Sequence, residues 1–305
     1  MKSLHRVLIA KRGEIAIRIR RAIHSRGGEA VAVYAGIDSA SLHIQGCDVV
    51  RRLPGSGIAP YLDIDAIIAA ARDTACNAIH PGYGFLAENA EFAQRCAEEG
   101  ITFVGPSPSA LALFGDKTRA RTLAQQLDIP VIPGSEGVLH DVVQAMQAAD
   151  RVGFPVMLKA AAGGGGRGMR VVTHAQDLAA AFDRASSEAL AAFGNGAMFL
   201  ERQLDRPRHI EVQILGDTTG NLLHLHERDC SVQRRHQKVI EIAPAPNLDP
   251  ALRDRLLSDA IKLTRTASYV NAGTVEFLVI PESGEYFFIE CNPRLQVEHT
   301  VTEQI

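Results

Sequence analysis

The chain has 305 residues, of which 46% are hydrophobic and 22% are charged. This balance is typical of soluble globular proteins and excludes fibrous and mostly disordered classes, and the length predicts about two domains. Lys and Arg number 32 against 35 Asp and Glu, for a formal net charge of −3, so there is no general basic field to attract nucleic acid. Any anion site in this chain must be built locally.

The absence of targeting signals and the pattern of cysteines limit the cellular compartments in which we expect this protein. The apolar stretch before Arg12 is too short for a signal peptide, and no apolar run is long enough to span a bilayer. The five cysteines include no CxxC pair, so neither a zinc framework nor a disulfide lattice is indicated. We expect a protein of the cytoplasm or of an organelle matrix, not secreted and with no membrane partner.

Residues 1–114 alternate short apolar runs with amphipathic segments. Strands are predicted at 7–10, 30–34, 77–80 and 102–105, and helices at 14–26, 63–73 and 88–99. Strands and helices that alternate at this pitch form βαβ units around a parallel sheet. The first domain is therefore predicted as α/β, with a doubly wound parallel sheet.

The pattern changes after residue 115. Helices are predicted at 116–127, after Asp141 (where Asp141-x-x-Gln144 resembles a capping box), in an Ala-rich segment around 178–189, and after Asp249. Strands are predicted at 154–159, 169–172, 197–202, 209–215, 222–228, 273–280 and 285–292. This second part, 115–305, is predicted as antiparallel-rich α+β.

A glycine loop at 163–168 fits the GxGxxG pattern. A dinucleotide site would need a helix after the loop, whereas Met169 opens a predicted strand, and a P-loop would need Lys-Ser or Lys-Thr. What remains is a strand–loop–strand hairpin whose bare amides could cover phosphates, with Lys159 as a nearby positive charge. The alternative is a flexible surface loop without ligand.

The last predicted hairpin turns near residue 283, which places Glu276 opposite Glu290. Strand alternation then puts Asn292 on the face of Glu290, and Phe287 and Ile289 on the other face. Two carboxylates roughly 5 Å apart repel by about 3 kcal/mol at an effective dielectric near 20. A Mg²⁺ or Mn²⁺ ion shared with phosphates would relieve this repulsion. The alternative is that one carboxylate points to solvent beside a lysine.

Two charged stretches lie near these strands. The run from Glu227 to Lys238 is either a solvated loop between two strands or an anion site. The segment from Arg294 to Glu298 follows the carboxylate hairpin directly, so an Arg and a Glu there could bind a small oxyanion and supply a base.

Together these segments resemble the biotin carboxylase family, the ATP-grasp half of biotin-dependent carboxylases. The matching stretches run essentially from end to end, at 12–16, 80–89, 115–117, 163–169, 227–238 and 290–303. The resemblance implies an N-terminal domain at 1–114 and an ATP-grasp domain at 115–305, with a lid at about 131–203. It also implies a ligase that uses ATP and bicarbonate, through carboxyphosphate, to carboxylate biotin on a carrier.

The resemblance carries functional residues over motif by motif. Lys117, Lys159 and the backbone of Gly163, Gly164, Gly165 and Gly166 would contact the ATP phosphates, Glu201 and Leu204 the adenine, and His209, Gln233, His236 and Leu278 the rest of the nucleotide. Glu276, Glu290 and Asn292 would hold Mg²⁺ or Mn²⁺, whereas Lys238, Arg294, Gln296 and Val297 would bind bicarbonate. Glu298 resembles the general base, and Tyr83 lies in the stretch that approaches biotin.

The implied partners are a biotin carboxyl carrier protein or domain and a carboxyltransferase subunit or domain, with a homodimer as an option for the full-length enzyme. Two departures stand out: Lys11 replaces the family's usual Asn, and the family continues past Glu303 into a C-terminal subdomain that supplies a further Arg. We therefore expect nucleotide binding with low turnover. The alternatives are another ATP-grasp ligase of the carbamoyl-phosphate synthase type, a nucleotide-binding fragment that is inactive in isolation, and an NAD-dependent dehydrogenase.

Overall fold

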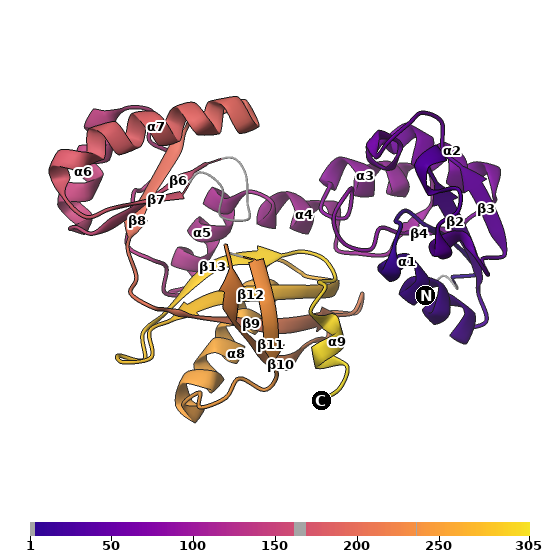
Figure 1. The fold of residues 1–305 in the computed structure, drawn as a ribbon. Coiled ribbons are helices and arrows are strands. Elements are labelled where there is room, and N and C mark those ends of the chain that lie inside the picture. Colours follow the sequence, from indigo (N-terminus) through magenta and orange to yellow (C-terminus); the bar gives the residue numbers. More distant parts are fainter. Residues whose placement is uncertain (1–3, 162–168, 236) are drawn as a thin grey trace.

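The computed structural model of the chain describes residues 4–161, 169–235 and 237–305. Within these residues the backbone forms three sheets, each packed against helices of its own (Figure 1). The N-terminal sheet and the small sheet of the predicted lid lie on opposite sides of a larger central sheet. The candidate functional residues are carried mainly by this central sheet.

The N-terminal sheet is parallel and has the strand order β3-β2-β1-β4-β5. Its elements are β1 (Arg6–Ile9), α1 (Glu14–Ser25), β2 (Glu29–Tyr34), β3 (Val49–Arg52), α2 (Ile64–Asp73), β4 (Ala78–His80), α3 (Ala90–Glu98) and β5 (Thr102–Phe103). Short 3₁₀ helices lie at Gly36–Asp38, Leu42–Ile44 and Ala59–Leu62. The predicted parallel doubly wound sheet is confirmed. Strand β3 went unpredicted because its residues are mostly exposed and show no apolar run.

Side-chain caps determine where several helices begin. The side chain of Asn89 accepts a hydrogen bond from the Phe92 N–H at 2.7 Å, so α3 begins at Ala90 and not at Glu88 as predicted. Asp63 and Asp141 cap α2 and α6 (Val142–Val152) in the same way. Because Glu88 lies before the cap, its side chain is available to the neighbouring domain.

The central sheet is antiparallel, in the order β11-β10-β9-β12-β13. Its strands are β9 (Arg208–Gly216), β10 (Leu222–Arg234), β11 (Gln237–Ile242), β12 (Asn271–Val279) and β13 (Tyr286–Asn292). The helices around it are α4 (Pro108–Phe114), α5 (Lys117–Gln126), α8 (Pro250–Thr266) and α9 (His299–Thr302). Helix α8 packs on one face and encloses the largest apolar core. We call the opposite face, which carries Glu211 and Glu276, the site face.

The charged run of β10 corrects one prediction. The strand does not end at Arg228 but continues to Arg234 and pairs with β11, so the solvated-loop interpretation of this run is wrong. Glu227 and Arg228 are fully buried, because each finds oppositely charged or polar partners inside the protein. Pairing between charges on neighbouring strands thus replaces the apolar pattern that usually marks a buried strand.

The predicted lid region contains the third sheet, in the order β7-β6-β8, with β6 (Val156–Ala160), β7 (Met169–Val172) and β8 (Met198–Arg202). Helices α6 and α7 (Ala175–Phe193) enclose a separate apolar core with it. Gly134 pairs with Glu201, and Val131 with Phe288 of the central sheet, where the chain enters this region. The glycine loop 163–168 lies outside the described residues. The boundaries of the domains and the lid remain predictions.

Candidate active site

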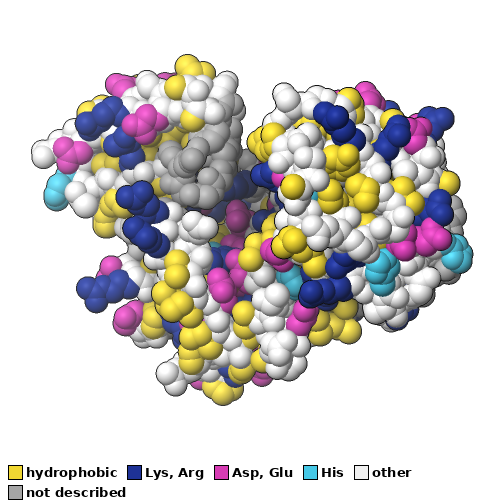
Figure 2. Space-filling model, turned by 45° about the vertical axis from the view of Figure 1, so that its right-hand side comes forward, with side chains coloured by type: hydrophobic (Ala, Val, Ile, Leu, Met, Phe, Trp, Pro, Cys, Tyr) yellow, Lys and Arg dark blue, Asp and Glu magenta, His cyan; other side chains and the backbone are white. Residues whose placement is uncertain are grey.

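The space-filling view shows a hollow between the lobe of the third sheet and the N-terminal domain (Figure 2). Acidic and basic side chains gather along the floor of this hollow. Most of the candidate residues belong to the site face of the central sheet and to the loop 293–298 that follows β13.

The pairing of β12 with β13 confirms the predicted opposition of Glu276 and Glu290. On the turn side of Glu290 the register shifts by one residue, because Ile289 forms a bulge, and Phe287 therefore pairs with Leu278. The prediction that Phe287 and Ile289 lie on the other face is therefore wrong. Phe287 and Ile289 belong with Leu278 to one apolar cluster, and the Phe287–Leu278 pair lies in line with Glu276 on the site face.

Glu276 is the centre of a buried polar network. Its Oε2 accepts a hydrogen bond from His209 Nε2 at 2.8 Å, and its Oε1 accepts from Lys238 Nζ and Asn292 Nδ2, each at 2.9 Å. The Gln233 amide donates to His209 Nδ1 at 2.8 Å, which leaves Nε2 to donate to Glu276. Burial alone would raise the pKa of Glu276, but the His209 hydrogen bond and the Lys238 charge outweigh burial and lower it.

Lys238 connects three carboxylates. Its ammonium contacts Glu211 and Glu276 directly and lies 3.8 Å from Glu298 Oε1. Burial by itself would lower the pKa of Lys238, but these three carboxylates raise it above its ordinary value. Lys238 is therefore an ammonium at every physiological pH.

Two residues behind Lys238 were not predicted. Arg228 and Glu211 are both fully buried and form an ion pair of 2.6 Å, Nε to Oε1. Arg228 also donates to Gln213 at 2.8 Å and to Thr302 of α9 at 2.6 Å. The alternation of polar and apolar residues along β9 was a signal that could have revealed Glu211, whereas the partners of Arg228 are distant in sequence.

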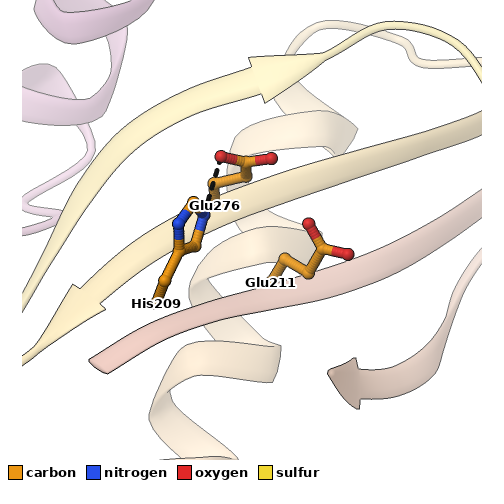
Figure 3. Close-up of side chains that lie close together, drawn as sticks. All are labelled: His209, Glu211 and Glu276. Carbon is orange, nitrogen blue, oxygen red and sulfur yellow. Dashed lines mark hydrogen bonds and ion pairs between the residues drawn. The ribbon is translucent and has the colours of Figure 1, made fainter. Parts of the chain in front are cut away.

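His209, Glu211 and Glu276 offer ligand atoms within 4.8 Å of one another (Figure 3). In this group both oxygens of Glu211 already accept from Arg228 and Lys238. Glu276, Glu290 and Asn292 offer oxygen donors on adjacent strands, the donor chemistry that Mg²⁺ and Mn²⁺ prefer. The Glu276 and Asn292 oxygens accept hydrogen bonds in this structure and would exchange these for an ion. Lys117 lies 3.5 Å from Glu290 Oε2, and Oε1 has no hydrogen-bond partner among the described residues. This donor set fits a hard divalent cation.

The same geometry tests the alternative to a metal. A carboxylate beside a lysine is indeed found, since Glu290 lies near Lys117, but Glu276 is buried and does not point to solvent. In this structure the repulsion expected between the two carboxylates is relieved by ammonium groups and by His209.

The candidate adenine end lies where the third sheet meets the central sheet. Leu204, Leu278 and Phe287 pack there in an apolar cluster. In β8, Glu201 pairs with Lys159 and lies 3.3 Å from Arg121 of α5. Arg121 was not predicted as a site residue. Lys159 is therefore bound to a carboxylate here.

The candidate bicarbonate end is formed by the loop 293–298. Arg294 pairs with Glu88 of the N-terminal domain and donates to Asn292 Oδ1 at 3.3 Å. Gln296 is buried and lies 3.3 Å from Glu276 Oε1, whereas the Val297 side chain is exposed. Tyr83 donates to Glu14 at the start of α1. Glu88 was missed because it was assigned to α3.

Thus the structure brings the predicted residues of the central sheet and the 293–298 loop into one continuous site. Lys159 and Glu201 lie at its lid side, and Tyr83 belongs to the N-terminal domain. Gly163, Gly164, Gly165, Gly166 and His236 lie outside the described residues. No helix in the described part of the chain is long and apolar enough to cross a membrane.

Two family models match the chain. Residues 116–305 match the carbamoyl-phosphate synthase L chain, ATP binding domain, and residues 3–111 match the biotin carboxylase, N-terminal domain. Among solved structures, biotin carboxylase from Campylobacter jejuni in a β,γ-ATP complex is similar with a TM-score of 0.95 and 48% identity, over 99% of this chain and 68% of that one. The chain belongs to the biotin carboxylase family.

Further relatives agree with this assignment. The biotin carboxylase domain dimer of Hydrogenobacter thermophilus 2-oxoglutarate carboxylase, solved with MgADP, ADP and bicarbonate, has a TM-score of 0.94 and 45% identity, covering 98% of this chain and 66% of that one. Mitochondrial pyruvate carboxylase of Rattus norvegicus is 54% identical, and pyruvate carboxylase of Staphylococcus aureus is 53% identical; each alignment covers 100% of this chain. The chain spans only 26% of the length of these two relatives.

The expected family and fold class are confirmed: a parallel-sheet N-terminal domain is followed by an antiparallel ATP-grasp domain. The relatives that match are biotin carboxylase and pyruvate carboxylases. The dehydrogenase interpretation is wrong. The match to an N-terminal biotin carboxylase domain also separates this chain from other ATP-grasp ligases.

Proposed function

We propose that this chain carboxylates biotin on a carrier protein or domain, using ATP and bicarbonate by way of carboxyphosphate. The observation that carries the proposal is the position of Lys238, which lies 3.8 Å from Glu298 and also contacts Glu276. A candidate base, an anion-binding ammonium and a candidate metal carboxylate therefore adjoin one another. This arrangement suits the activation of bicarbonate beside the phosphates of a nucleotide.

In the proposed mechanism Glu298 accepts the proton of bicarbonate while Lys238 and Arg294 balance the developing negative charge. Gln296 and the backbone at Val297 complete the anion site. The freed oxygen then attacks the γ-phosphorus of ATP, and the bond from that phosphorus to the ADP oxygen breaks. Tyr83 lies on the N-terminal side, where biotin would approach.

The remaining site residues would hold the nucleotide. Glu276, Glu290 and Asn292 would bind Mg²⁺ or Mn²⁺, which neutralises phosphate charge when bound. Lys117 and Lys159 would contact phosphate oxygens, which requires Lys159 to exchange its Glu201 contact for phosphate. The apolar cluster at Leu204 and Leu278 and the polar side chains of Glu201, His209, Gln233 and His236 would enclose the rest of the nucleotide.

The partners are proposed on the same basis. The relatives are biotin-dependent carboxylases, which supports a carrier protein or domain and a carboxyltransferase subunit or domain as partners. The H. thermophilus structure is described as a dimer, which supports a homodimer of the full-length enzyme. The named relatives favour a 2-oxo acid such as pyruvate as the final carboxyl acceptor.

The decisive experiment measures ADP release from MgATP and bicarbonate, with and without free biotin. We expect biotin to stimulate release, and Glu298→Gln to abolish the stimulation while MgATP affinity, measured by calorimetry, is unchanged. Lys159→Ala provides the inactive reference, and Glu282→Gln, in the exposed β12–β13 turn, provides the matched carboxylate control. ATP binding without any biotin stimulation would refute biotin carboxylation by this chain and favour a nucleotide-binding fragment.

A further inference from the structure

Lys11 is a half-buried ammonium to which the proposed mechanism gives no task. It follows β1, and the loop 80–85 follows β4, the parallel neighbour of β1. In the order β3-β2-β1-β4-β5, β1 and β4 are the two strands between which the chain reverses its direction across the sheet. Ligands of open parallel sheets bind at the carboxyl ends of the strands at this switch point.

The loop 80–85 encloses the Lys11 side chain. A Cβ placed on Gly82 would lie 3.1 Å from Lys11 Cγ, and one on Gly84 would lie 3.3 Å from Nζ. The ammonium lies 3.5 Å from the centroid of the Phe85 ring and 5.7 Å from that of Tyr83. Both glycines have positive φ, so the backbone conformation and the space around it favour glycine here.

The ammonium lacks an acceptor. Among residues 4–161, 169–235 and 237–305, none accepts a hydrogen bond from Lys11 Nζ or forms an ion pair with it. The carboxylates that belong to the groups around Lys11 have other partners: Asp38 pairs with Arg12, Glu88 with Arg294, and Glu14 accepts from Tyr83. Burial and the charges of Arg12 and Arg294 lower the pKa of Lys11 to about 8. An anion bound here would reverse these unfavourable effects on the charged amine.

Lys11 also faces the candidate bicarbonate end. Leu295 packs with Tyr83 against the N-terminal apolar cluster, which brings the loop 293–298 onto this part of the sheet. We propose that the Lys11 ammonium is an oxyanion-binding group at the junction of the two domains, and that its ligand is a carboxylate-type anion. The source of that carboxylate is bicarbonate itself or the carboxylated urea ring formed from it. This inference rests on the proposed function.

Amine labelling tests the proposal directly. Acetylation by acetic anhydride at about pH 7.5 is followed by mass spectrometry for Lys11 and for Lys262, an exposed lysine on α8 that serves as the internal control. If a bound anion raises the pKa of Lys11 by about one unit, its neutral fraction and labelling rate fall about eightfold at this pH. Sodium chloride at equal ionic strength controls for unspecific screening.

The arms of the experiment separate the two sources. Slower labelling of Lys11 with bicarbonate alone identifies bicarbonate, whereas slowing that requires MgATP, bicarbonate and biotin together identifies the carboxylated urea. The proposal would be overturned if the labelling of Lys11 relative to Lys262 is the same in every arm. It would also be overturned if Lys11 is not labelled in the protein without ligand. If wild-type protein shows no biotin-stimulated ADP release, the proposed function fails, while the bicarbonate arm still decides the role of Lys11.

Two variants separate anion binding from a structural role. Lys11→Met retains an apolar stem beside Gly82 and Gly84 but removes the charge, and Lys11→Arg keeps the charge. We expect Lys11→Met to raise the KM for bicarbonate, or for biotin if the product is the ligand, by about tenfold, with the KM for MgATP unchanged and Lys11→Arg closer to wild type. Equal changes in all three constants, or no change in any, would contradict the proposal.

Discussion

Arg228 provides the sharpest test of how the site is held together. Replacing it with Met keeps a long side chain but removes the guanidinium from a fully buried position. Two buried acceptors, Glu211 Oε1 and Gln213 Oε1, lose donors at 2.6 and 2.8 Å. A buried acceptor without a partner costs about 1–3 kcal/mol, and breaking a buried ion pair from one side costs about 3–5 kcal/mol. We expect Arg228→Met to lower the free energy of unfolding by about 3–5 kcal/mol.

The assay is urea denaturation followed by far-UV circular dichroism, since the chain has no Trp to report by fluorescence. Arg95→Met is the control, because it breaks an exposed pair with Asp65, for which we expect a loss below about 1 kcal/mol. Glu211→Gln added to Arg228→Met removes the uncompensated charge, so the double variant should recover part of the loss. A loss below about 1 kcal/mol, or no coupling between the two sites, would refute the argument.

Three further results are expected. Gly134→Ala should lower the free energy of unfolding by about 1–3 kcal/mol, because its Cβ would lie 2.4 Å from Leu200 O. Gly137→Ala, whose Cβ would have nothing within 4 Å, should leave the stability unchanged; thermal unfolding of both variants measures the difference. Burial and the Arg18 charge lower the pKa of His80 from 6.5 to about 4. Because the unfolded chain then binds a proton at a higher pH than the folded protein, the contribution of His80 to the free energy of unfolding is fully present above the unfolded pKa and is lost as the pH falls from 6.5 toward 4. His80→Asn, which keeps an acceptor for the Gly82 N–H, should reduce the stability difference between neutral pH and about pH 5; an unchanged difference would argue against this assignment. Glu290→Gln should weaken MgADP binding roughly tenfold in calorimetry but leave metal-free ADP binding unchanged; equal weakening of both would speak against a metal role.

Local rules of sequence were sufficient for much of the fold. The alternation of apolar runs and amphipathic segments predicted the parallel sheet, and the Asp63 and Asp141 caps lie where the helices begin. The Glu276–Glu290 pair was predicted from a turn near residue 283, although the pairs next to the turn are centred half a residue earlier and the bulge at Ile289 makes up the difference. Phe287 was placed on the wrong face because the bulge at Ile289 leaves no mark in the residue pattern.

The unpredicted part of the site depends on contacts between distant segments. Arg228 lies in a charged stretch that resembles a surface loop, and its burial depends on partners from two other parts of the chain, Glu211 and Gln213 of β9 and Thr302 of α9. Glu88 reaches Arg294 across two domains. Charge alone could not distinguish these residues from solvated ones, because burial of a charge becomes favourable only where its partner is already in place.

The bulge at Ile289 also has a consequence for the tolerance of this hairpin to insertions and deletions. Between Ile289 and Asn292 the pairing carries Glu290 opposite Glu276, and on the turn side it carries Phe287 opposite Leu278. Because the bulge is the extra residue, removing Ile289 would restore a continuous alternation and keep both sets of side chains on their present faces. A residue added between these two segments would instead shift one set of side chains to the opposite face. Length changes in the turn at Glu282 and Ser283 would leave both pairings intact. Natural insertions in this hairpin should therefore be confined to its tip.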